Sequence, residues 1–243
     1  MSASAYASGR PGQTGTARLW PRTVVPGSVD SMGCNRLRPW LLGLALVAIS
    51  ACSAPPPKSE HALFEEANRE FERRNFFTAS TLYDELLEQY PFSEVAELAR
   101  LRVAHAYYLN GKYEKAIAAF GDFERLHPTS PRIPFVEYTI GMCYLEQIES
   151  RDRDQSAAEN ALRQFQRVVQ RYPNSVYGRL ASFRLAQVQQ HLADHELFVG
   201  DYYAKSGKPK AAAARYRYIL EHYPDTDAAR TARERLASME HRS

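Results

Sequence analysis

The chain has 243 residues, of which 24% are charged, and its formal net charge is +3. Five arginines and one aspartate give residues 1–51 a net charge of +4, which leaves −1 for residues 52–243. A protein that binds nucleic-acid phosphates needs a concentrated basic surface, so this balance excludes nucleic acid as a partner.

Residues 1–51 are expected to be a signal peptide. An apolar run over residues 39–51 follows Arg36 and Arg38, and a basic entry before a short apolar run is typical of an export signal. The run is shorter than the roughly 20 apolar residues that a membrane-spanning helix needs, so it is expected to be removed. Translation is expected to start at Met32, because residues 1–31 have no hydrophobic periodicity.

The end of this segment predicts a lipid anchor. The sequence Ile49-Ser50-Ala51-Cys52 resembles the lipobox of bacterial lipoproteins, in which two small residues precede a Cys that accepts diacylglycerol. The alternative is an ordinary cleavage site with an incidental Cys. Residues 52–58 then form the lipidated Cys and a Pro-rich tether, which is expected to be extended and moderately stiff.

One pattern occurs four times in residues 59–243: an Ala, then an aromatic residue after three intervening positions, then a Pro after seven more. This is the tetratricopeptide pattern, in which each unit is a pair of helices of about 34 residues. The sequence therefore predicts an all-α, tetratricopeptide-like helical repeat solenoid. The four copies are Ala79-Tyr83-Pro91, Ala116-Phe120-Pro128, Ala161-Phe165-Pro173 and Ala212-Tyr216-Pro224.

A small residue precedes the pattern in each repeat and predicts where the paired helices approach closely. Ala67, Ala104 and Gly200 lie 12 positions before the Ala, whereas Gly141 lies 20 before it, so the third repeat carries an eight-residue insertion. A helical stretch over residues 176–192 is expected to continue into the first helix of the fourth repeat. A last helix near residues 227–240 is expected to cap the solenoid.

No residues in this pattern suggest catalysis. Cys143 is left as a single thiol and is expected to be a small buried hydrophobe. His191 and His195 share a helical face, but zinc needs at least three protein ligands, so both are expected to face solvent. Neither a nucleophile elbow nor a phosphate-binding Gly loop occurs, and the protein is expected to be no enzyme and to hold no metal or cofactor.

Several of these features together resemble the BamD family of outer-membrane β-barrel assembly lipoproteins. They include the lipobox, the short tether, the insertion Arg-Asp-Arg-Asp, and repeat turns that begin with an aromatic residue or His followed by Pro. The resemblance implies a lipid-anchored protein at the periplasmic face of the outer membrane. The turns and motifs are Tyr90-Pro91-Phe92-Ser93, His127-Pro128-Thr129, Tyr172-Pro173-Asn174-Ser175-x-Tyr177, Asp201-Tyr202-Tyr203 and Tyr223-Pro224-Asp225-Thr226.

The resemblance also implies partners: unfolded outer-membrane proteins as substrates, the barrel insertase BamA, and other lipoproteins of the assembly complex. Longer family members continue beyond the region that here covers residues 232–243. The family places the insertase contact on the C-terminal repeats, where Arg215 should point away from the packed Tyr216. Arg151 and Asp152 of the insertion are further candidates for a partner contact, because loops on repeat scaffolds often bind partners.

The substrate is expected to bind the concave surface that the first helices of the repeats form. Residues just after each small packing residue, and one turn away from it, should face this groove. The alternative is that these side chains only pack between repeats. The candidates are Asn68, Phe71, His105, Tyr108, Tyr138 and Met142.

Two other functions fit the same architecture. One is an envelope adaptor that organises peptidoglycan enzymes or the Tol system, and the other is an inner-membrane scaffold with an uncleaved anchor. Ser53, rather than Asp, follows Cys52, which favours outer-membrane sorting by resemblance to other lipoproteins. The cleavable lipobox argues against the uncleaved anchor.

Overall fold

The computed structural model describes residues 58–240, and this part of the chain forms nine α-helices and no β-strand. The predicted all-α fold is thereby confirmed. The predicted signal peptide and Cys52 lie outside the described residues. The helices are α2 (Glu60–Glu72), α3 (Phe76–Gln89), α4 (Ala96–Leu109), α5 (Tyr113–Leu126), α6 (Ile133–Leu145), α7 (Ser156–Arg171), α8 (Val176–Lys205), α9 (Pro209–His222) and α10 (Asp227–Glu240).

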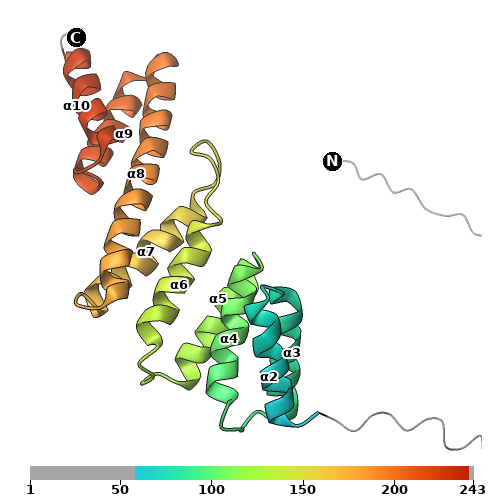
Figure 1. Cartoon of the computed structure of the whole chain (residues 1–243). Coiled ribbons are helices and arrows are strands. Elements are labelled where there is room, and N and C mark those ends of the chain that lie inside the picture. The colour runs from blue at the N-terminus through green and yellow to red at the C-terminus, as the bar shows by residue number, and fades with distance from the viewer. Residues whose placement is uncertain (1–57, 241–243) are drawn as a thin grey trace, which may run out of the picture. The chain divides into compact units, whose positions relative to one another are not determined.

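The helices pack as consecutive antiparallel pairs, α2 with α3, α4 with α5, α6 with α7, and α8 with α9, and α10 packs on the last pair (Figure 1). Each repeat places its aromatic residue at the contact between the two helices. Tyr83, Phe120, Phe165 and Tyr216 are all at most 1% exposed. The pattern of Ala, aromatic residue and Pro therefore does mark the second helix of every pair.

The small residues of the first helices allow this close approach. A Cβ atom added at Gly141 would lie 2.6 Å from Cε1 of Phe165, and one added at Gly200 would lie 2.6 Å from Cε1 of Tyr216. Both distances are far below van der Waals contact, so the aromatic ring lies directly against the backbone of the first helix. The register of the helix pairs that was predicted from the sequence is confirmed.

The tight turns inside the pairs need a left-handed residue. Gly111 and Gly207 both have φ of 69° and provide it before α5 and α9. In the first repeat the corresponding residue is Arg74, with φ of 65°, although a side chain makes this conformation costly. The sequence indicated only the two glycines.

Helix α8 is one continuous element of 30 residues, as expected from the stretch over residues 176–192. Ser175 caps its start, and its Oγ accepts a hydrogen bond from the N–H of Gly178 at 2.8 Å. A Cβ atom at Gly178 would lie 2.0 Å from the carbonyl oxygen of Tyr172, so only Gly allows the chain to turn into α8 this closely. The last helix spans Asp227–Glu240, where the sequence predicted it.

Three clusters of buried apolar residues follow one another along the described solenoid. Cys143 lies in the middle cluster and is fully buried, which confirms the prediction that it is a core residue. Burial raises the pKa of its thiol to about 12. Among the helices of residues 58–240, none combines the length and the apolar character that crossing a membrane requires.

Candidate functional site

A pocket of about 330 Å³ opens on the face formed by the first helices of the repeats. Its walls come from α4, from the start of α6 with the turn before it, and from the first turn of α8. Its lining combines apolar, aromatic and basic side chains, which is a usual composition for a ligand site. We call it the aromatic pocket, and its lining residues are Leu98, Leu101, Arg102, His105, Pro131, Arg132, Phe135 and Tyr177.

Aromatic rings continue across four successive first helices and meet in this pocket. The ring of His105 lies 5.5 Å from that of Phe71 and 5.4 Å from that of Phe135. Phe135 lies 5.6 Å from Tyr177, which in turn lies 5.8 Å from Tyr138. These distances are those of attractive edge-to-face and tilted ring pairs. The result is a strip of ring faces that runs from α2 to α8.

Two guanidinium groups give the aromatic pocket positive charge. The guanidinium of Arg102 lies over the ring of Phe71 at 5.0 Å, and Arg132 is exposed at the start of α6. Burial lowers the pKa of His105, and the nearby charge of Arg102 lowers it further. His105 is therefore neutral near pH 7 and offers a ring with one N–H donor and one acceptor.

The predicted groove residues lie in different surroundings. His105 lines the aromatic pocket, and Phe71 and Tyr138 adjoin it through ring contacts. Tyr108 is half-buried, and its ring stacks on His105 at 6.3 Å. Asn68 is also half-buried, and its Oδ1 accepts a hydrogen bond from the hydroxyl of Tyr83 at 2.6 Å. The Asn68 side chain, which was expected to face the groove, thus also links the two helices of the first pair.

The prediction that Met142 faces the groove is wrong. Its side chain is 9% exposed and belongs to the core that α6, α7 and α8 share. The adjacent Gly141 lets Phe165 approach the backbone of α6, and Phe165 belongs to the same core as Met142.

Of the eight residues that line the aromatic pocket, the sequence predicted only His105, and the missed residues include Arg102, Arg132, Phe135 and Tyr177. Arg102 lies one helical turn before His105, and Phe135 lies one turn before Tyr138, so a wider use of the same periodicity would have found both. Tyr177 is on α8, whose first half has no counterpart in the repeat pattern, and no signal in the sequence places it here.

The eight-residue insertion lies between α6 and α7 and contacts α8. His195 donates from Nδ1 to the carbonyl oxygen of Arg151, and Nε2 of His191 lies 2.8 Å from Oε1 of Gln155. The guanidinium of Arg151 lies 5.6 Å from the centre of the Phe198 ring. Both histidines are half-buried and contact the insertion, whereas the sequence led us to expect that they face solvent.

The other predicted partner residues lie on exposed parts of the fold. Asp152 is exposed, and the hydrogen bond that Ser150 donates to it is the main cause that lowers its pKa. Arg215 on α9 points away from the core, as predicted, and its Nη1 lies 2.9 Å from Oε2 of Glu196 on α8. The side chain of Arg215 is 44% exposed, whereas that of Glu196 is 14% exposed.

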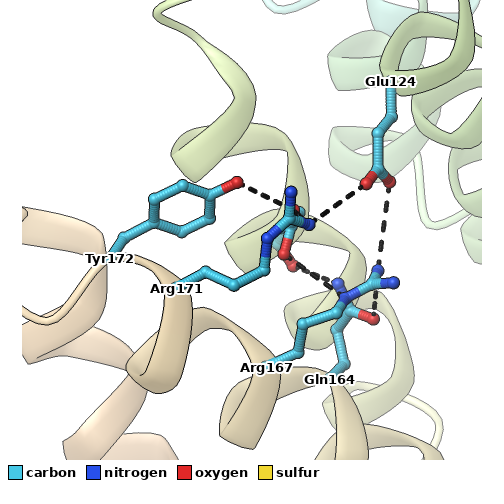
Figure 2. A network of polar contacts seen from close by, with 6 residues as sticks. Glu124, Gln164, Arg167, Arg171 and Tyr172 are labelled. Atoms are coloured by element: carbon cyan, nitrogen blue, oxygen red, sulfur yellow. Dashed lines mark hydrogen bonds and ion pairs between the residues drawn. The ribbon is translucent and has the colours of Figure 1, made fainter. Parts of the chain in front are cut away.

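Two arginines of α7 bind a buried carboxylate of the third repeat and also pair with Glu124 of the second repeat (Figure 2). Glu137 on α6 is completely buried. Its Oε1 accepts a hydrogen bond from Arg171, and its Oε2 lies 3.3 Å from Nε of Arg167. The hydroxyl of Tyr172 donates to Glu137 at 3.0 Å. Glu124 on α5 lies 3.6 Å from Arg171. We call these five residues the Glu137 network, and no sequence pattern predicted it.

Comparison with known proteins adds to this description. A family model described as "YfiO: Outer membrane lipoprotein" matches residues 56–242. The chain is 34% identical over 219 residues to an outer membrane protein assembly factor BamD of Neisseria meningitidis serogroup B, and the alignment covers 82% of this chain and 80% of that protein. It is 33% identical over 164 residues to the BamD of Caulobacter vibrioides, and this match covers 68% of the chain but only 54% of the relative.

Among solved structures, a thermophilic TPR protein of Thermus thermophilus aligns with 74% of this chain and with its own whole length. The sequence identity is 16% and the TM-score is 0.39.

Proposed function

The chain belongs to the YfiO family of outer membrane lipoproteins, and relatives that it matches are BamD assembly factors. We propose the following function for it. It is a scaffold of the β-barrel assembly machinery, held at the periplasmic face of the outer membrane by lipid on Cys52. It binds unfolded outer-membrane proteins in the aromatic pocket and the barrel insertase through its C-terminal repeats.

The aromatic pocket is the observation that carries the substrate part of this proposal. Its rings offer stacking surface for an aromatic side chain, and its two guanidinium groups can bind a carboxylate with paired hydrogen bonds. An extended chain that ends in an aromatic residue carries both groups at one position. The pocket therefore suits the free C-terminus of an unfolded chain better than an internal apolar segment.

Removing the charge of this pocket should weaken binding of such a C-terminus. For Arg102→Gln and for Arg132→Gln we expect the Kd of a peptide that ends in phenylalanine to rise roughly tenfold, because a hydrogen bond to a charged group contributes about 1.5 kcal/mol or more. Fluorescence anisotropy of a labelled peptide measures this change.

Two controls make the peptide experiment specific. Arg163→Gln removes an exposed arginine of α7, outside the aromatic pocket, and should leave the Kd unchanged. A peptide with a C-terminal amide lacks the carboxylate, so its weaker binding should be the same for wild type and variants. Equal losses for the carboxylate and amide peptides, or no loss for either, would contradict the proposed carboxylate contact.

The insertase part of the proposal rests on the family and on Arg215. Arg215→Glu should strongly reduce recovery of the insertase when the protein is isolated from envelope membranes. The variant also places two carboxylates together, because Arg215 is paired with Glu196. Both a lost partner contact and a disturbed α8–α9 pair could therefore lower the recovery.

A charge exchange separates these two causes. The double variant Arg215→Glu with Glu196→Arg restores an internal ion pair but reverses the charge presented on α9. Insertase recovery that stays low in the double variant supports a direct contact by Arg215. Recovery that returns to the wild-type amount means that Arg215 only holds α9 against α8.

A further inference from the structure

Phe92 is almost completely exposed, although its side chain is large and apolar. It lies in the turn between α3 and α4, and 98% of its surface is open to solvent. Hydrogen bonds hold the turn around it: the N–H of Ser93 donates to the carbonyl of Tyr90 at 3.2 Å, and Nη2 of Arg100 donates to the carbonyl of Pro91 at 3.1 Å. An apolar ring presented on a turn that is already fixed can be buried by a partner with little further loss of backbone entropy.

This turn lies beside the point where the chain enters the repeat domain. The hydroxyl of Tyr90 donates to the carbonyl oxygen of Lys58 at 2.9 Å. In Figure 1 the start of α2 and the turn between α3 and α4 lie at the same edge of the solenoid. Lys58 lies only six positions after Cys52, and six residue steps of extended chain cover about 20 Å at most. Lipid on Cys52 would keep this edge close to the membrane surface.

A second apolar side chain from the next repeat lies at the same edge. Leu126 at the end of α5 is 47% exposed and lines one shallow pocket together with Phe92. The turn also carries the exposed carboxylate of Glu94, whereas Glu97 accepts a hydrogen bond from Ser130. A carboxylate next to the ring opposes deep insertion into hydrocarbon. The edge therefore suits the boundary between headgroups and acyl chains.

We infer that this edge contacts the phospholipid bilayer, with the Phe92 ring inserted at the headgroup level of the leaflet that holds the acyl chains. The contact would fix how the first two repeats are oriented on the membrane, which a tether alone does not do. This inference rests on the proposed acylation of Cys52, and the experiment reports on the anchor and the contact separately.

Tryptophan fluorescence provides the test. Trp20 and Trp40 both precede Cys52, so the processed chain contains no Trp, and Phe92→Trp introduces a single fluorophore. The acylated protein is purified in detergent and reconstituted into vesicles of phosphatidylethanolamine and phosphatidylglycerol, with or without brominated acyl chains. We expect blue-shifted emission, and a loss of most of its intensity when the brominated lipid is present.

Phe77→Trp is the matched control. Phe77 is 70% exposed in the first turn of α3, at the end of the first repeat away from the start of α2. A Trp there should emit at the wavelength of a water-exposed indole and should not be quenched by brominated lipid. The two variants carry the Trp at opposite ends of α3.

Flotation of the vesicles is measured on the same samples. Phe92→Trp protein that floats while its indole remains in water overturns the inference and leaves the lipid anchor intact. Protein that does not float at all overturns the anchor and the inference together. A blue shift that requires added envelope proteins and is absent with lipid alone assigns the ring to a protein contact, and also overturns the inference.

Discussion

Replacing Arg167 and Arg171 together by methionine is expected to lower the free energy of unfolding by about 3–5 kcal/mol, because the change leaves a buried carboxylate without its counter-charges. Glu137 is completely buried, whereas the side chains of Arg167 and Arg171 are 45% and 50% exposed. The arginines can regain water when their partner is lost, but the carboxylate cannot. The cost of breaking the Glu137 network should therefore depend strongly on which side is removed.

Urea denaturation of three variants tests this asymmetry. Adding Glu137→Gln to the double methionine variant removes the stranded charge and should restore a large part of the lost stability. Glu137→Gln alone should cost less than the double methionine variant, since both arginines remain partly hydrated. A triple variant no more stable than the double variant would mean that the arginines contribute through packing and not through the carboxylate.

Cys52→Ser is expected to remove the protein almost entirely from the outer-membrane fraction, since a Ser cannot carry the thioether-linked diacylglycerol. Each acyl methylene buried in the bilayer contributes about 0.8 kcal/mol, and stable anchoring normally takes more than one chain. A single apolar ring such as Phe92 is too small to replace this contribution. The variant should accumulate as an unprocessed precursor or as free periplasmic protein, which fractionation and immunoblotting distinguish.

Cys143→Ala is the control for Cys52→Ser, because it removes the other Cys of residues 52–243 from a fully buried position. It should leave the distribution between membrane and soluble fractions unchanged. If the Cys52→Ser protein still sediments with outer membranes after a salt wash, the anchor is not lipid on Cys52.

The repeat architecture could be predicted from the sequence because the same packing residues recur in each repeat. The small residue, the Ala and the aromatic residue stand at the contact of two helices, and a fixed spacing leaves one possible register. Gly141 and Gly200 met their aromatic partners as expected. The eight-residue insertion did not hide the third repeat, since it lies between the two helices and changes neither.

The candidate site was predicted only in part, because it depends on contacts between repeats. Periodicity identifies the helix face on which His105 lies, but it does not reveal that Tyr177 of α8 closes the pocket. Glu137 stands in an otherwise apolar stretch of α6, and such a carboxylate must be paired if it is buried. Its arginine partners lie 30 and 34 positions later, and no local rule connects residues at that distance.

The continuous helix α8 has a mechanical consequence. Its first turn carries Tyr177 of the aromatic pocket, and Glu196, the partner of Arg215, lies 19 positions further along the same helix. At a rise of 1.5 Å per residue the two positions are about 30 Å apart. The helix is continuous between these two positions and has no hinge there. A rigid tilt of α8 at the pocket would therefore also displace the part of α8 that packs against α9.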